Sequence, residues 1–194
     1  MALNINVKQM LRTKAMNEGT LRIAVVSPIN RSGASVVATV LAQAAALTQG
    51  LKTVITYTSA AKTLPIYLNV ERQVEDKTRS ISQVVKLLQA DAISVEELDE
   101  YALKLDTNCY MMDTVSETIT REEALAVQKY VFTNIDADIA LCDISEALDE
   151  PVAQELISVA NAVCFVLNQM KLLLKHSVPG LSQNIGLRVR ITSL

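Results

Sequence analysis

The sequence predicts an α/β protein in which helices cover both faces of a mostly parallel β-sheet. Short apolar runs rich in β-branched residues recur along the chain, and such runs are typical of strands buried on both faces. Ala-rich or amphipathic segments with helix-capping signals separate these runs, as in successive βαβ units. Half of the 194 residues are apolar and 20% are charged, so the chain has enough apolar surface for a buried core.

A polar segment with weak helical periodicity precedes the first strand. Within residues 4–18, apolar side chains stand at Val7, Met10, Leu11 and Ala15, and Gly19 then marks a turn. We expect a helical extension over residues 1–20 and a single α/β domain over residues 21–194, a length that suits one domain.

The first βαβ unit is the clearest pattern in the sequence. Residues 21–27 form a β-branched run that ends at Pro28, and residues 34–49 form an Ala-rich run that is apolar almost all round. The Ala-rich run is expected to be a buried helix with Gly50 as its left-handed C-cap. Residues 52–57 then predict a second strand, parallel to the first and reached by a right-handed crossover.

The centre of the chain contains three segments in which a capping-box pair precedes an amphipathic run. The pairs are Ser80 with Gln83, Ser94 with Glu97, and Thr120 with Glu123. We therefore expect a helix after each pair, the second of them extending through Leu98, Tyr101 and Leu105.

The remaining elements follow the same alternation. Apolar runs predict strands at residues 108–113, 138–143 and 162–168. Pro151 suits the first turn of a helix, and residues 170–176 predict another helix. Residues 187–191 alternate apolar side chains with arginines, which predicts a half-exposed strand at an edge of the sheet.

The loop between the first strand and the Ala-rich helix is the candidate ligand site. In α/β proteins this loop lies at the C-terminal edge of the sheet, where anions bind at the helix N-terminus. A phosphate-binding loop needs glycines for close backbone approach, a lysine for charge and a Ser or Thr hydroxyl for magnesium. Residues 27–35 read Ser-Pro-Ile-Asn-Arg-Ser-Gly-Ala-Ser and contain only part of this set.

The strand, the Gly-containing loop and the Ala-rich helix together resemble the deviant P-loop ATPases of the ParA/MinD type, a family of the SIMIBI class. The resemblance covers the pattern of elements over residues 21–168 and implies a P-loop NTPase-like three-layer α/β/α sandwich. Proteins of this family place chromosomes, plasmids, division sites or pili. Their loop looks like K-G-G-x-G-K-[ST].

Three residues match positions that the family uses around phosphate and magnesium. Gly33 matches the last glycine, with Ser32 at the variable position before it, and Ser35 matches the magnesium-binding hydroxyl. Asp143 stands where the family has the aspartate of its D-x-x-P segment, although Glu146 replaces the proline. The resemblance therefore places Ser35 and Asp143 on the magnesium side of the site.

Four residues of the loop depart from the family pattern. Ile29 and Ala34 stand at the two lysine positions, and Asn30 and Arg31 replace the two glycines. Without either lysine, the charge on a transferring phosphoryl group is poorly stabilised, which lowers the rate by orders of magnitude. We therefore expect a degenerate nucleotide loop with no catalytic residue, no metal site and no requirement for ATP or magnesium.

These features favour a non-catalytic ParA/MinD-like scaffold that acts in partitioning, polar positioning or cytoskeletal assembly. Charge is distributed unevenly, with a net +4 over residues 1–31 and again over residues 169–194, and −11 over residues 32–168. A chain with basic ends and an acidic centre can attract copies of itself. We therefore expect a homo-oligomer, either a dimer or a filament, together with a protein partner.

Two other functions stay open. One is a nucleotide-dependent ATPase switch with a divergent P-loop, which would use Arg31, Ser35 and Asp143. The other is a DNA-binding adaptor in plasmid or phage maintenance, because non-specific DNA binding rests on phosphate neutralisation. The cations available for it are Lys171, Lys175, Arg188 and Arg190.

Composition disfavours other kinds of site. His176 is the only histidine, which excludes two-histidine metal sites and leaves a Cys142–His176 dyad as a formal alternative. The three cysteines stand in apolar runs, so we expect buried thiols in a reducing cytoplasm. The acids Glu96, Glu97, Asp99 and Glu100 suit the polar face and first turn of a helix rather than a metal site. Residues 170–174 are too short for a membrane anchor, and no apolar run is long enough to span a bilayer.

Overall fold

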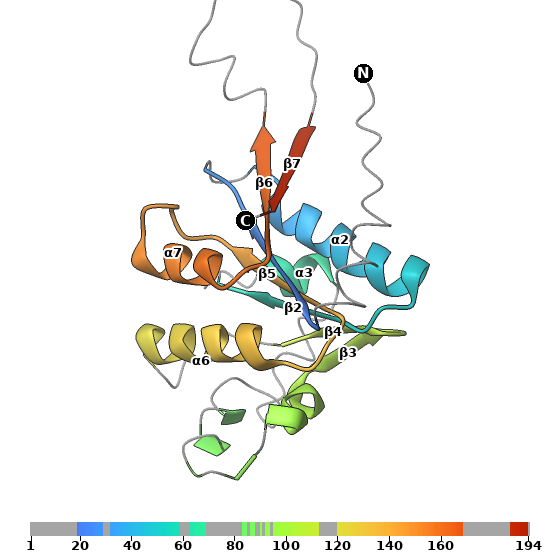
Figure 1. Cartoon of the computed structure of the whole chain (residues 1–194), viewed down its shortest axis with the longest axis vertical. Helices are drawn as coiled ribbons and strands as arrows, with labels where there is room; N and C mark the ends of the chain where they lie inside the picture. Colours follow the sequence, from blue (N-terminus) through green and yellow to red (C-terminus); the bar gives the residue numbers. More distant parts are fainter. Residues whose placement is uncertain are drawn as a thin grey trace, which may run out of the picture.

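A computed structural model of the chain contains one seven-stranded sheet with helices on both of its faces (Figure 1). The structure describes residues 19–28, 32–58, 63–68, 83–84, 86–87, 90, 92–93, 95–112, 120–168 and 187–193. The helices expected at residues 4–18 and 170–176 lie outside these ranges, and the division into an extension and one domain stays a prediction.

The elements follow the alternation that the sequence predicts. The strands are β1 (Leu21–Val26), β2 (Thr53–Tyr57), β3 (Leu103–Asp106), β4 (Cys109–Met111), β5 (Ile139–Ile144), β6 (Ala162–Asn168) and β7 (Leu187–Ser193). The helices are α2 (Ala34–Gln49), α3 (Thr63–Tyr67), the 3-10 helix η2 (Val95–Tyr101), α6 (Arg121–Asn134) and α7 (Pro151–Ser158).

The sheet is parallel in its centre and antiparallel at both edges. Its order is β3-β4-β2-β5-β1-β6-β7. Neighbours from β4 to β6 pair in parallel, whereas β3 and β7 each pair antiparallel with the strand beside them. This confirms the predicted fold class and the edge position of the last strand. The strands β1 and β2 are parallel as expected, and β5 lies between them.

The helices α2 and α7 leave the same region of the sheet on opposite faces. The first connects β1 to β2, while the second connects β5 to β6 on the other side of β1 (Figure 1). Connections that diverge in this way leave a crevice at the carboxyl ends of the strands, where ligands of open α/β sheets bind. The topology therefore places the candidate loop at that crevice.

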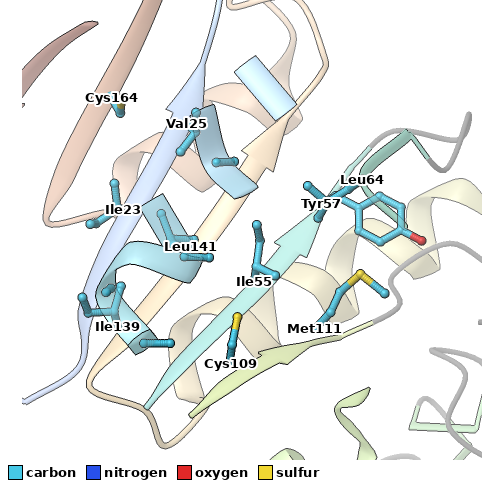
Figure 2. Close-up of a cluster of buried hydrophobic side chains, with 14 of the residues drawn as sticks. Ile23, Val25, Ile55, Tyr57, Leu64, Cys109, Met111, Ile139, Leu141 and Cys164 are labelled. Atoms are coloured by element: carbon cyan, nitrogen blue, oxygen red, sulfur yellow. The ribbon is translucent and has the colours of Figure 1, made fainter. Parts of the chain in front are cut away.

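Two apolar cores fill the space between the three layers. One joins the sheet to α2 and α3, and its members include Ile23, Ile55 and Leu141 (Figure 2). The other joins the opposite face of the sheet to α6 and α7, with Phe132 and Leu156 among its members. Because strand side chains alternate between faces, β5 contributes to both cores.

Helix α2 has the predicted bounds, but it is buried on one side only. Four alanines face the sheet and are almost fully buried: Ala38, Ala42, Ala45 and Ala46. Val40 and Leu47 are each 57% exposed, so the expectation of a helix buried all round was wrong. The outer layer of a three-layer sandwich has only one neighbour, and apolar composition alone does not reveal that. Gly50 is the predicted left-handed C-cap, with φ 66°.

The segment after Ser94 also differs from its prediction. A 3-10 helix ends at Tyr101, and Leu105 lies in β3 rather than in a helix. The strand β3 forms a hairpin with β4 in which Asp106 pairs with Cys109, and Asn108 supplies the positive φ of 60° in the turn. Pairing with the sheet thus overrides the local capping signal, as often happens in short segments. Of the helix expected after Ser80, residues 83–84 and 86–87 are helical.

The capping box predicted for α6 is present and provides a test of the local folding signals. Both the backbone N–H and the hydroxyl of Thr120 donate to the Glu123 carboxylate, and the Glu123 N–H donates to Thr120 Oγ1 at 3.2 Å. We expect Thr120→Ala to lower the free energy of unfolding by about 1 kcal/mol, because the Glu123 N–H loses its acceptor and the Glu123 carboxylate loses a hydroxyl donor. Urea denaturation measures this loss.

A matched threonine provides the control for this test. Thr48 lies exposed in the last turn of α2, where its hydroxyl donates to the Ala44 carbonyl of its own helix. Thr48→Ala is expected to change the free energy of unfolding by less than about 0.5 kcal/mol, as exposed helix substitutions usually do. Equal losses in the two variants would contradict a stabilising role for the capping box.

Candidate functional site

Polar side chains link the carboxyl ends of β2 and β5. The Thr58 N–H donates to the Asp143 carbonyl at 3.0 Å, and the Ser145 N–H donates to Thr58 Oγ1 at 2.8 Å. The two hydroxyl oxygens, Thr58 Oγ1 and Ser145 Oγ, lie 3.1 Å apart. These bonds hold both strand ends together at the edge of the sheet where the topology predicts ligand binding. Sequence reasoning missed this link, and its one signal is a polar residue directly after each apolar run.

The start of α2 lies at the same edge. Gly33 is the N-cap, with φ 94° and ψ 17°, and its carbonyl accepts the Val37 N–H at 3.0 Å. This left-handed conformation favours glycine. Because glycine has no side chain, it caps none of the N–H groups in the first turn. An uncapped N-terminus of a long helix attracts anions through its free N–H groups and its dipole.

The structure brings Ser35 and Asp143 together. The Ser35 hydroxyl donates a hydrogen bond to the Asp143 carboxylate, whose residue is only 1% exposed. Within the described part of the chain, Asp143 Oδ2 and the buried hydroxyl oxygen of Ser32 have no hydrogen-bond partner. A buried polar atom without a partner carries a free-energy penalty of about 1–3 kcal/mol and is typical of a functional site.

The carboxyl group of Asp143 stands in an environment that disfavours its charge. Burial raises its pKa to about 6, and the negative charge of Glu146 contributes to this increase, whereas the Ser35 hydrogen bond opposes it. Glu146 is itself 7% exposed, so two carboxyl groups lie buried at the end of β5. Such a site gains stability from a cation that compensates the carboxylate.

The donor set suits magnesium better than it suits a triphosphate. A hydroxyl and a carboxylate are the oxygen ligands that Mg²⁺ prefers, so Ser35 and Asp143 fit this ion. The described part of the loop, Ser32 to Ser35, carries no cation to hold the phosphates. Ile29, Asn30 and Arg31 lie outside the described residues. The roles of these loop residues therefore stay predictions.

Other candidate sites receive no support from the described residues. Burial raises the pKa of Cys142 to about 12, which keeps this thiol protonated and unsuited to act as a nucleophile, and His176 lies outside the described ranges. All three cysteines are buried and free, as predicted. Over the same ranges no group of three or more His, Cys, Asp or Glu side chains is placed to hold a metal ion.

The basic and apolar segments near the end of the sequence are tested only in part. Residues 170–176, with Lys171 and Lys175, lie outside the described ranges, and Arg188 and Arg190 belong to β7 at the edge of the sheet. Among the helices that the structure describes, each is too short or too polar to cross a bilayer.

The fold and the position of the loop define a three-layer α/β protein with a P-loop-like first βαβ unit. Among solved structures, the chain is similar to a plasmid partition protein from Borrelia burgdorferi, with 15% identity, a TM-score of 0.50 and coverage of 74% of this chain and 63% of the other. A candidate plasmid partition protein from B. burgdorferi B31, bound to AMPPNP, gives the same identity and TM-score and covers 74% and 60%.

These similarities establish a shared fold with plasmid partition proteins. The chain spans less than two thirds of the length of the two Borrelia proteins. No protein-family model and no curated protein matches the chain. The resemblance read from the first βαβ unit thus agrees with the fold of the solved partition proteins, while the degenerate character of the loop stays a prediction.

Proposed function

We propose that this chain is a partition-type spatial-organisation protein that assembles with copies of itself and with a protein partner, and that it does not hydrolyse ATP. The shared fold with plasmid partition proteins supports the role in positioning. The three free, buried cysteines are consistent with action in a reducing cytoplasm. ATP and magnesium are not required cofactors in this proposal.

One observation carries the non-catalytic part of the proposal. Ala34 is the first residue of α2, directly between the N-cap Gly33 and the Ser35 that bonds to Asp143. A cation at this position would compensate the buried carboxylate and the phosphates, and alanine supplies none. Phosphoryl transfer depends almost entirely on such positioned charges, so their loss removes most of the rate acceleration.

The direct test is ATP hydrolysis by the purified chain with magnesium. We expect phosphate release at the rate of the uncatalysed reaction, and the same rate for Asp143→Ala and Ser35→Ala. Turnover that is abolished in both variants would overturn the non-catalytic assignment. The comparison with the variants separates hydrolysis at this site from a contaminating ATPase.

Self-association has its own test. We expect the mass from light scattering to rise with protein concentration in the absence of nucleotide, because assembly no longer depends on a nucleotide switch. A strict monomer at every concentration, with or without ATP, would contradict this part of the proposal.

A nucleotide-dependent switch is the second candidate function. The Ser35–Asp143 hydrogen bond and the uncapped start of α2 favour it, since both suit a bound magnesium–phosphate group. Calorimetric titration with ATP and magnesium separates the candidates. Micromolar affinity that is lost in Arg31→Ala would favour the switch, and no measurable heat would favour the scaffold. No feature of the described residues favours the DNA-binding adaptor over these two.

A further inference from the structure

A groove between α6 and α7 forms a surface feature that the proposed function does not use. Its apolar floor comes from both helices and consists of Leu125, Ala126, Val152 and Leu156. Glu122, Lys129 and Glu155 flank this floor, and Lys129 Nζ lies 2.9 Å from Glu155 Oε2. The two helices lie on the face of the sheet opposite to α2 (Figure 1). The groove is therefore remote from the start of α2.

The charged side chains that the structure describes on and beside these two helices are mostly acidic. On α6, α7 and the turn before α7, the side chains that the structure describes include five exposed acids and one cation, Lys129. Glu122 and Glu155 line the groove, and the exposed acids Glu123, Asp149 and Glu150 lie elsewhere on α6 or in the turn before α7. An apolar floor flanked by Glu122 and Glu155 is complementary to an amphipathic segment that carries positive charge.

The chain contains such a segment directly before β1. Residues 4–18 have Val7, Met10, Leu11 and Ala15 at helical spacing, and their charged residues are Lys8, Arg12, Lys14 and Glu18, a net +2. We propose that the groove between α6 and α7 is the docking site of residues 4–18 of the same chain.

The anchor point of this segment supports docking within one molecule. Thr20 Oγ1 donates to the Ile135 carbonyl at 3.3 Å, and Arg22 Nε donates to the Phe132 carbonyl at 3.1 Å. These bonds place the start of β1 beside the end of α6. Because the start of β1 is held beside the end of α6, residues 4–18 have a high effective concentration near the groove.

The length of the segment also matches the groove. At about 1.5 Å per residue, Lys8 of a helix would lie roughly 16 Å before Gly19, and Glu122 lies roughly 18 Å before the end of α6. By the same rise, Lys14 would lie roughly 8 Å before Gly19, and Lys129 of the Lys129–Glu155 pair lies roughly 8 Å before the end of α6. Lys8 would therefore be level with Glu122, and Lys14 with the Lys129–Glu155 pair, where it would share the Glu155 carboxylate.

The other exposed apolar surface is less suited to this segment. It lies over α2 and α3, with Val36, Val40, Leu47, Ile66 and Tyr67 exposed. Helix α2 carries no charged residue, so this surface has no charge on α2 that would attract the basic segment of residues 4–18. This surface supplies the control position for the test.

Disulfide trapping in the full chain tests the proposal. Leu11→Cys is combined with Ala126→Cys in the groove, or with the exposed Ala44→Cys on α2 as the matched control. The three native cysteines are fully buried and react slowly, so they do not compete. We expect a disulfide within one molecule to form at least about 10-fold faster for the groove pair, as effective concentration dictates. Equal rates for the two pairs, or a disulfide only between two molecules, would overturn the proposal.

Charge reversal provides a second readout. Lys8→Glu with Lys14→Glu is expected to slow trapping in the groove several-fold, whereas Lys104→Glu on the exposed face of β3 leaves the rate unchanged. Raising the salt from about 0.1 M to about 1 M shortens the Debye length from about 10 Å to about 3 Å and should have the same slowing effect. A trapping rate that stays the same after charge reversal and at high salt would contradict docking by charge complementarity.

Discussion

Asp143→Asn is expected to raise the free energy of unfolding by about 2 to 3 kcal/mol at neutral and alkaline pH. The folded state holds the pKa of Asp143 at about 6, above its ordinary value of 3.8. The folded chain therefore binds this proton more tightly than the unfolded chain does. The contribution of this proton to the free energy of unfolding is fully present below about pH 4 and is lost as the pH rises to about 6. Its size is about 1.4 kcal/mol per unit of pKa difference between the folded and unfolded states. Asparagine stays neutral throughout and keeps an acceptor for the Ser35 hydroxyl.

Chemical denaturation of both proteins in chelator-treated buffer, across this pH window, measures the effect. The free energies of unfolding of the native chain and of Asp143→Asn should converge at acidic pH and separate as Asp143 ionises. Asp136→Asn provides the control, because Asp136 is 83% exposed and pairs with Lys52 at 3.7 Å. Its change should stay below about 0.5 kcal/mol. A destabilised Asp143→Asn variant at neutral pH would show that a compensating cation accompanies the native carboxylate.

Local sequence signals predicted the elements whose boundaries depend on residues close by in the sequence. The bounds of α2 follow from Gly33 and Gly50, which flank an Ala-rich run, and the start of α6 follows from the Thr120–Glu123 pair. Each signal acts over a few residues, so the sequence contains all the information that it needs. The strands at the centre of the sheet were equally clear, because burial on both faces requires continuous apolar runs.

Features that depend on distant contacts could not be read in this way. Leu105 belongs to a strand because β4 offers a hairpin partner, and Val40 is exposed because no further layer covers α2 in the described structure. The bond between Thr58 and Ser145 joins residues far apart in the sequence, at the ends of two neighbouring strands. Only the strand order, which the sequence does not specify, makes them neighbours.

The candidate site also has features that the sequence predicts and features that only the folded structure shows. The pairing of Ser35 with Asp143 was reached through the family resemblance, since neither spacing nor composition relates these two positions. The raised pKa of Asp143 was not expected at all, because it arises from burial at the end of β5 together with the charge of Glu146. A sequence pattern identifies candidate ligands, whereas the packed structure determines their charge state.

A lysine at the start of α2 is expected to raise the affinity of the site for ATP and to lower the pKa of Asp143. We predict that Ala34→Lys raises the affinity for ATP with magnesium by about 10- to 100-fold, since a charge-assisted hydrogen bond to phosphate contributes about 1.5–3 kcal/mol. Gln43→Lys is the matched control, because it adds the same charge on the exposed face of α2, remote from Gly33. Calorimetric titration of the three proteins measures the gain.

The same substitution should also change the protonation of Asp143. A cation beside the Ser35–Asp143 pair favours the carboxylate and lowers its pKa, so Ala34→Lys should lose part of the stability change between about pH 4 and about pH 6. Both effects arise from one missing charge, and they should therefore appear together in Ala34→Lys and be absent in Gln43→Lys. A gain in ATP affinity without the change in pH dependence would mean that phosphate binds away from the end of β5. A different outcome is that the native chain already binds ATP and that Ala34→Lys adds no affinity. It would mean that residues outside Ser32 to Ser35 supply the positive charge that holds the phosphates.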